Sequence, residues 1–63
     1  MEPSEIFALI VKADEKLKYA TEDRGAQRRE QAKALLEEAV READAIGNLA
    51  LAEQALLRLE DLE

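Results

Sequence analysis

The chain has 63 residues, of which 15 are acidic and 9 basic, giving a formal net charge of −6 at pH 7. It contains no cysteine and no histidine, which excludes disulfides, thiolate metal sites and the usual neutral-pH proton shuttle. The negative charge also disfavours contact with a phosphate backbone, so we expect no nucleic-acid binding.

The composition is that of a small helical protein. Ala, Glu, Leu, Arg and Lys make up 42 of the 63 residues, which is typical of long helices. A chain of this length forms at most one domain, so we take residues 1–63 as a single unit. The longest apolar run, residues 6–11, is too short to span a membrane, and no basic segment precedes it as in a secretory signal. We expect a soluble chain of cytoplasmic type without membrane contact; no particular location is indicated.

The first predicted helix covers residues 4–23. Pro3 suits a first turn, and Ser4 is a candidate N-cap. We expect the helix to end near Gly25, because glycine readily adopts the left-handed conformation that ends helices. Apolar residues recur at alternating spacings of four and three, which places them on one face. This stripe consists of Ile6, Ile10, Ala13, Leu17 and Ala20, broadened by Leu9.

The second predicted helix covers residues 26–46, and Gly47 and Asn48 follow it. Glycine is typical of a helix end and asparagine of a helix start, so this pair predicts a break between two helices. The apolar stripe of the second helix consists of Ala32, Leu36, Ala39, Ala43 and Ile46, with Leu35 and Val40 beside it.

The third predicted helix covers residues 49–62. Its expected buried arc consists of Leu49, Ala52, Ala55, Leu56, Leu59 and Leu62. Two short connections force neighbouring helices to run antiparallel. The apolar stripe of each helix is then buried against the stripes of the other two. The sequence therefore predicts an all-α, up-down-up antiparallel three-helix bundle. An alternative stays open: Gly47 inside a helix costs only about 1 kcal/mol, so the second and third segments could fuse into one long helix of a dimerising helical hairpin.

No arrangement of residues suited to catalysis is evident. The hydroxyl groups of Ser4, Tyr19 and Thr21 have no histidine to activate them. Neighbouring carboxylates, such as Glu37 and Glu38, point about 100° apart on a helix and do not converge. The inner faces carry only aliphatic side chains, which leaves no ligands for a metal pair. We expect no enzyme activity, no cofactor, no metal and no small-molecule substrate.

Some apolar residues lie away from the predicted stripes and are candidates for partner contact. Phe7 and Val11 lie about 100–140° from the buried arc of the first helix. They could cover the edge of the core against the third helix, or anchor a partner, since charged residues flank them. Leu57 and Tyr19 also lie off the stripes, and each could be an ordinary surface residue or a contact. The predicted partner-binding residues are Phe7, Val11, Tyr19 and Leu57.

Residues 30–40 resemble the second helix of a tetratricopeptide repeat, and residues 47–49 with Ala52 and Leu56 resemble its turn and following helix. Residues 20–40 are also similar to the microtubule-interacting-and-trafficking domain, a three-helix bundle that grips partner helices in a groove. The whole chain resembles de novo designed three-helix mini-proteins in length, in its five dominant residue types and in its glycine-based loops. These resemblances imply peptide binding, or a scaffold, assembly subunit or binder that presents one helix face.

The function expected from the sequence is a non-catalytic protein–protein interaction module, designed or engineered, which binds a partner or itself through a helix face. One alternative is a purely structural scaffold or homo-oligomer subunit without a separate ligand. Another is a natural tetratricopeptide-like fragment that binds peptides. The expected partner is another protein or a second copy of this chain. Only a monomeric scaffold would have no partner.

Overall fold

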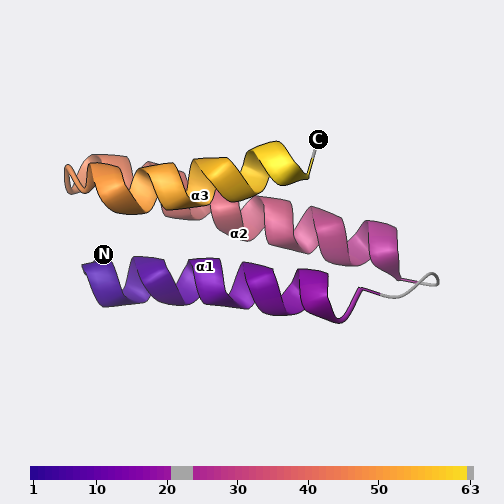
Figure 1. The fold of residues 1–63 in the computed structure, drawn as a ribbon. Coiled ribbons are helices and arrows are strands. Elements are labelled where there is room, and N and C mark those ends of the chain that lie inside the picture. Colours follow the sequence, from indigo (N-terminus) through magenta and orange to yellow (C-terminus); the bar gives the residue numbers. More distant parts are fainter. Residues whose placement is uncertain (21–23, 63) are drawn as a thin grey trace.

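The computed structural model describes residues 1–20 and 24–62, which form three helices: α1 (Pro3–Lys18), α2 (Gly25–Ala45) and α3 (Leu49–Asp61). The helices run up, down and up (Figure 1). α2 packs against both other helices, whereas α1 and α3 approach each other over fewer residues. The predicted all-α three-helix bundle is confirmed. The alternative of one long helix from residue 26 onward is wrong.

The turn between α2 and α3 shows why the chain breaks there. Gly47 has a φ of 71°, a left-handed conformation that most residues avoid. Its N–H donates to the carbonyl of Asp44 at 3.1 Å, and the N–H of Asn48 donates to the carbonyl of Ala43 at 2.8 Å. These paired bonds close the end of α2. Asn48 Oδ1 then accepts from Leu51 N at 3.1 Å and caps α3, as the sequence predicted.

The boundaries of α1 differ from the prediction at both ends. The helix is capped at Glu2 rather than Ser4, because the Glu5 side chain accepts a hydrogen bond from the Glu2 N–H at 3.1 Å. It ends at Lys18 rather than continuing to residue 23, and residues 21–23 lie outside the described part of the chain. Gly25 opens α2 instead of ending α1, since it does not adopt a positive φ. Glycine permits a left-handed bend but does not require one.

The core is a narrow strip of mostly small side chains. Six of its nine residues are alanines, which let the helices approach closely, and only Ile6, Ile10 and Leu36 are large and fully buried. No polar side chain is buried among the described residues. The core consists of Ile6, Ile10, Ala13, Ala32, Leu36, Ala39, Ala43, Ala52 and Ala55.

Three residues assigned to buried stripes are exposed. Leu49 is 75% exposed and Leu56 47%, because the buried side of α3 centres on Ala52 and Ala55 and these leucines lie on its edge. Ile46 is 42% exposed because it caps the end of α2, beyond the last turn that packs. Leu59 and Leu62 of the predicted arc are half-buried against the core, and Leu51, which the prediction left out, is half-buried with them.

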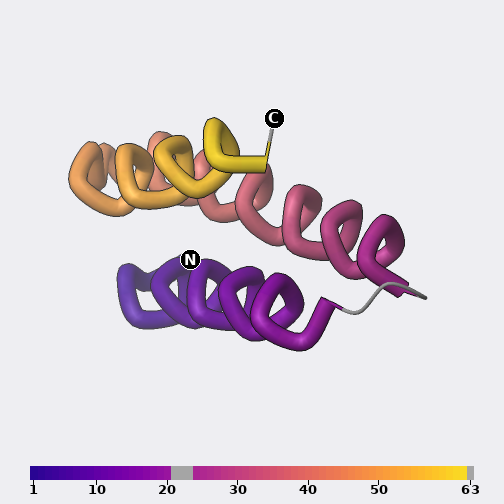
Figure 2. The backbone as a smooth tube through the Cα atoms, turned by 45° about the vertical axis from the view of Figure 1, so that its right-hand side comes forward, coloured from indigo at the N-terminus to yellow at the C-terminus, as the bar shows by residue number. Residues whose placement is uncertain are grey.

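The bundle is slim, with principal extents of 38, 20 and 13 Å. α3 is the shortest helix, and the N-terminal part of α2 extends past its end (Figure 2). None of the described helices is both long and apolar enough to cross a membrane.

Candidate interaction surfaces

Phe7 and Val11 form an exposed apolar pair on α1. Phe7 is 55% exposed and Val11 37%, and neither belongs to the half-buried side chains packed against the core. Four residues of helix separate them by about 6 Å along the axis and about 40° around it, so they lie on one face. Ile6 and Ile10 of the same helix are buried and hold it against the bundle. The pair is therefore presented to solvent on a rigid support.

The other two predicted contact residues lie apart from this pair. Tyr19 is 63% exposed and caps the end of α1, about 12 Å along the axis from Val11. The Lys18 ammonium lies 5.7 Å from the centre of its ring, a distance at which the two attract. Leu57 is 51% exposed on the side of α3 opposite to its buried alanines. The structure thus joins Phe7 with Val11, but it does not gather all four residues into one surface.

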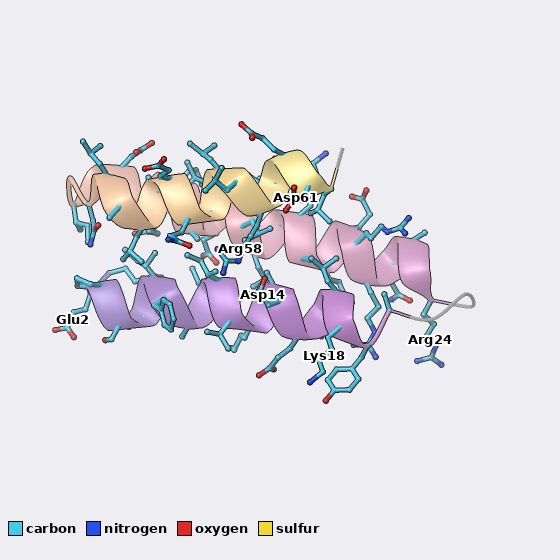
Figure 3. The ribbon with its side chains drawn as sticks, in the orientation of Figure 1. Glu2, Asp14, Lys18, Arg24, Arg58 and Asp61 are labelled. Atoms are coloured by element: carbon cyan, nitrogen blue, oxygen red, sulfur yellow. The ribbon has the colours of Figure 1, made fainter. Side chains whose placement is uncertain are left out.

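An ion pair crosses between α1 and α3 close to the face of α1 that carries Phe7 and Val11, which we call the Phe7 face. Arg58 Nε donates to both carboxylate oxygens of Asp14, at 3.0 and 3.1 Å. The same guanidinium donates through Nη1 to the backbone and side-chain oxygens of Gln54. Figure 3 shows Asp14 and Arg58 pointing toward one another between the two helices, whereas Lys18 points away. This pair ties α3 to α1, the two helices that approach each other over the fewest residues.

Sequence reasoning missed the exposed leucines of α3. Leu49 and Leu56 lie one heptad apart on the same edge of the helix and are both exposed. Half-buried Leu51 was left out of the predicted arc, although it lies on the core side of the helix. A helical wheel centred on Ala52 and Ala55 places Leu51 and Leu56 at about the same angle on opposite sides, and Leu49 slightly farther away. Packing therefore decides that Leu51 is half-buried and Leu56 exposed.

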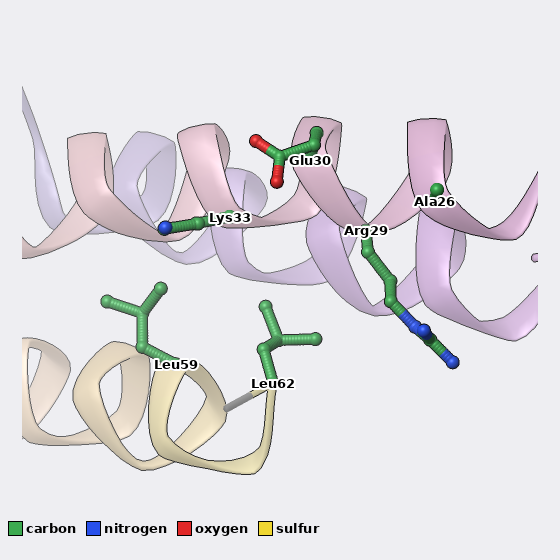
Figure 4. A pocket seen from close by; sticks show the side chains of 6 residues that line it. All are labelled: Ala26, Arg29, Glu30, Lys33, Leu59 and Leu62. Carbon is green, nitrogen blue, oxygen red and sulfur yellow. The ribbon is translucent and has the colours of Figure 1, made fainter.

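A groove of about 310 Å³ lies where α2 extends past the end of α3. Its floor is apolar, formed by Leu59 and Leu62, and Arg29 and Lys33 flank it. Figure 4 shows both leucines pointing from α3 toward α2, where Glu30 and Lys33 line the opposite side of the groove. No buried polar side chain lies in it to fix the orientation of a small ligand, so the groove is an open end of the helix–helix contact.

Two further grooves lie between α1 and α2, near the ends joined by the first connection. One is lined by Lys12, Lys16, Arg28, Glu15, Tyr19 and Leu35. The other is lined by Lys16, Arg24, Arg28, Gln27 and Gln31. Cations from two helices thus gather on this face, although the chain as a whole is acidic. The sequence alone shows only the arginines near the start of α2 as a cluster.

The described residues show no gathering of three or more acidic side chains able to hold a metal ion. The expectations of no metal, no cofactor and no catalysis stay predictions. No protein-family description, curated protein or solved structure matches this chain.

Proposed function

We propose that this chain is a non-catalytic protein-binding module that presents the outer face of α1 to a helical partner. The observation that carries the proposal is the exposed pair of Phe7 and Val11, which the core does not use. The resemblance to tetratricopeptide repeats implies peptide binding, and designed helical mini-proteins serve as scaffolds, assembly subunits or binders that present one helix face.

The chemistry of this face suits an interface anchor. An aromatic side chain contributes a large apolar area, and binding energy in interfaces concentrates on such residues when polar groups surround them. Asp14 and Lys18 provide polar groups of both signs beside the pair. Because α1 is already folded and packed, binding costs little ordering of the backbone.

The partner that fits is an amphipathic helix with a short apolar stripe. A helix laid along α1 covers Phe7 and Val11 through residues spaced three and four apart. The net charge of −6 favours a partner of positive charge, which it would attract over a distance at low salt.

The test is a variant that changes both residues without altering the net charge, Phe7→Glu with Val11→Lys. Immobilised wild-type and variant proteins are compared for the proteins they retain from a complex mixture, by quantitative mass spectrometry. We expect specific partners to be lost from the variant, because a buried apolar anchor has become charged, while the circular dichroism spectrum and melting temperature stay nearly unchanged.

The matched control is Leu49→Glu, which places a charge on a residue that is 75% exposed on another helix. It should retain the partners that the double variant loses. If the Phe7→Glu, Val11→Lys variant retains the same partners as the Leu49→Glu control, the proposal is overturned. A collapse of the melting temperature of the α1 variant would also overturn it, because that would show Phe7 and Val11 to be structural.

A further inference from the structure

The facing edges of α1 and α2 carry stripes whose charge changes sign along the molecule. Residues of each stripe are spaced alternately three and four apart, so each stripe follows one edge of its helix. On α2 the stripe runs from basic to acidic: Arg24, Arg28, Gln31, Leu35, Glu38 and Glu42. On α1 it runs from acidic to basic: Glu2, Glu5, Leu9, Lys12 and Lys16. We call these two stripes together the seam face.

The antiparallel packing of α1 and α2 brings like charges together within one molecule. At one end, the N atom of Met1 lies 3.9 Å from Glu42 Oε2, which places the start of α1 beside the acidic end of α2. At the other end, Lys16 and Arg28 line the same grooves. In between, Leu9 and Leu35 are half-buried against the core. The seam face is therefore acidic at one end, apolar in the middle and basic at the other end.

This pattern is the reverse of what a helix pair needs for its own stability. Residues that flank the contact between two helices usually carry opposite charges, which attract across it. Within residues 1–20 and 24–62 the two ion pairs are Asp14 with Arg58 and the Met1 amino group with Glu42, so none joins an acidic to a basic side chain of the seam face. The charges of this face therefore do not stabilise the contact between α1 and α2, and they suit pairing with charges of another molecule.

We propose that the seam face binds a second copy of this chain, antiparallel to the first and related by a two-fold axis that passes near Leu9 and Leu35. Rotation about an axis perpendicular to the helices lays α2 on α2 and α1 on α1. Arg24 then faces Glu42 of the second copy, and Arg28 faces its Glu38. On α1, Lys16 faces Glu2 of the second copy, and the Leu9 side chains meet near the axis.

The charges also select this orientation over the other one. A two-fold axis parallel to the helices would place acidic ends on acidic ends and basic ends on basic ends. Like charges facing each other are destabilising, so this arrangement is disfavoured. The antiparallel arrangement is the one in which every charged end of the seam face meets its opposite.

The start of α2 gives an independent reason for carboxylates to approach. The first turn of α2 contains no acidic residue, and the Arg24 side chain forms no cap. The positive end of the helix dipole therefore faces two arginines of the same sign, Arg24 and Arg28. Glu38 and Glu42 of the second copy would bring negative charge to this helix end. A contact of about 800 Å² per molecule, usual for stable interfaces, is under a fifth of the 4477 Å² surface of the chain.

The seam face and the Phe7 face do not compete. Phe7 and Val11 lie about 150° around α1 from the middle of its charged stripe. The inference goes beyond the proposed function and holds without it, because a dimer formed through the seam face leaves the Phe7 face exposed on both copies.

Sedimentation equilibrium at low salt tests the proposal, using two variants that make the α2 stripe uniform in sign. Arg24→Glu with Arg28→Glu makes it acidic throughout, and Glu38→Arg with Glu42→Arg makes it basic throughout. The wild type should reach twice its mass of 7.1 kDa with rising concentration. Each variant alone should dissociate more easily, by about tenfold or more in Kd at ~0.01 M ionic strength, where exposed charges act over ~30 Å. An equimolar mixture of the two should recover the association, because the acidic stripe faces the basic one.

Loss of folding does not explain such a result, since acidic residues at the start of α2 and basic residues near its end both favour the helix dipole. Circular dichroism checks this directly. Phe7→Glu with Val11→Lys serves as the control and should leave the dimer intact. A wild type that stays monomeric overturns the proposal. A dimer that the charge variants leave unchanged, or that the Phe7 variant abolishes, also overturns it, and the latter would make the Phe7 face the self-contact.

Discussion

Two glycines of this chain have opposite structural roles, although both adjoin helix ends. Gly47 adopts a φ of 71°, and no atom lies within 4 Å of the position a side chain would occupy. Gly25 likewise has open space around it, but its φ is not positive. The backbone conformation, and not crowding, therefore decides what a substitution does at each position.

We predict opposite effects for alanine at these two positions. Gly47→Ala should lower the free energy of unfolding by about 1–2 kcal/mol, because alanine is strained in the left-handed conformation. Gly25→Ala should raise it by about 0.4–1 kcal/mol, because alanine restricts the unfolded chain and favours the helix. Urea denaturation followed by circular dichroism measures both. A destabilised Gly25→Ala variant would show that the start of α2 is not helical at this residue.

At the scale of the helices, the ends of α2 and α3 depend on one short turn. Asn48 closes α2 through its backbone N–H and starts α3 through its side chain. Asn48→Ala should lower the free energy of unfolding by about 1 kcal/mol, because the N–H of Leu51 loses its partner. Asn48→Asp replaces the accepting amide oxygen with a carboxylate oxygen and should be close to neutral. Thermal melting of the two variants separates loss of the cap from any change at Asn48.

The sequence predicted those features of the helices that local chemistry determines. The glycine–asparagine turn follows from two adjacent residues, and the stripe from Ile6 to Ala13 follows from spacing alone. The extent of α1 could not be read in this way, since its last turn depends on what α2 can cover. The exposed Leu49 likewise depends on how far α3 rotates about its axis, which packing decides.

The candidate surfaces also differ in whether one helix or the packing of two helices defines them. The exposure of Phe7 and Val11 could be inferred from their place on a helical wheel, and their role as a partner anchor stays a prediction. The seam face could not be recognised from sequence, because it combines residues of two helices that lie up to 40 positions apart. Only the antiparallel packing places Lys16 beside Arg28, and Glu42 beside the start of α1.

For the whole molecule, stability rests on a few large side chains. At about 0.05–0.15 kcal/mol per residue, a chain of this size has a free energy of unfolding of about 3–9 kcal/mol. Leu36 is fully buried in the middle helix, and Leu36→Ala should cost about 2–5 kcal/mol. We therefore expect this variant to lose a large share of its free energy of unfolding and to melt well below the wild type. Leu57→Ala, at a residue that is 51% exposed, should change stability by less than about 0.5 kcal/mol.

Circular dichroism and urea titration distinguish these outcomes. A Leu36→Ala variant as stable as the wild type would mean that the alanine-lined contact does not hold the helices together. Equal losses from Leu36→Ala and Leu57→Ala would show that the outer side of α3 is buried, as in an assembly.

The thinness of the core has an evolutionary consequence. Nine side chains specify the interior, and six of them are already the smallest that can pack between helices. Most other described positions face solvent at least in part. Away from the turn at Gly47 and Asn48 and from the half-buried residues packed on the core, substitutions alter the molecule's contacts while leaving its architecture intact. Such a chain tolerates extensive mutational drift, and new recognition properties can arise on one flank without disturbing those on another.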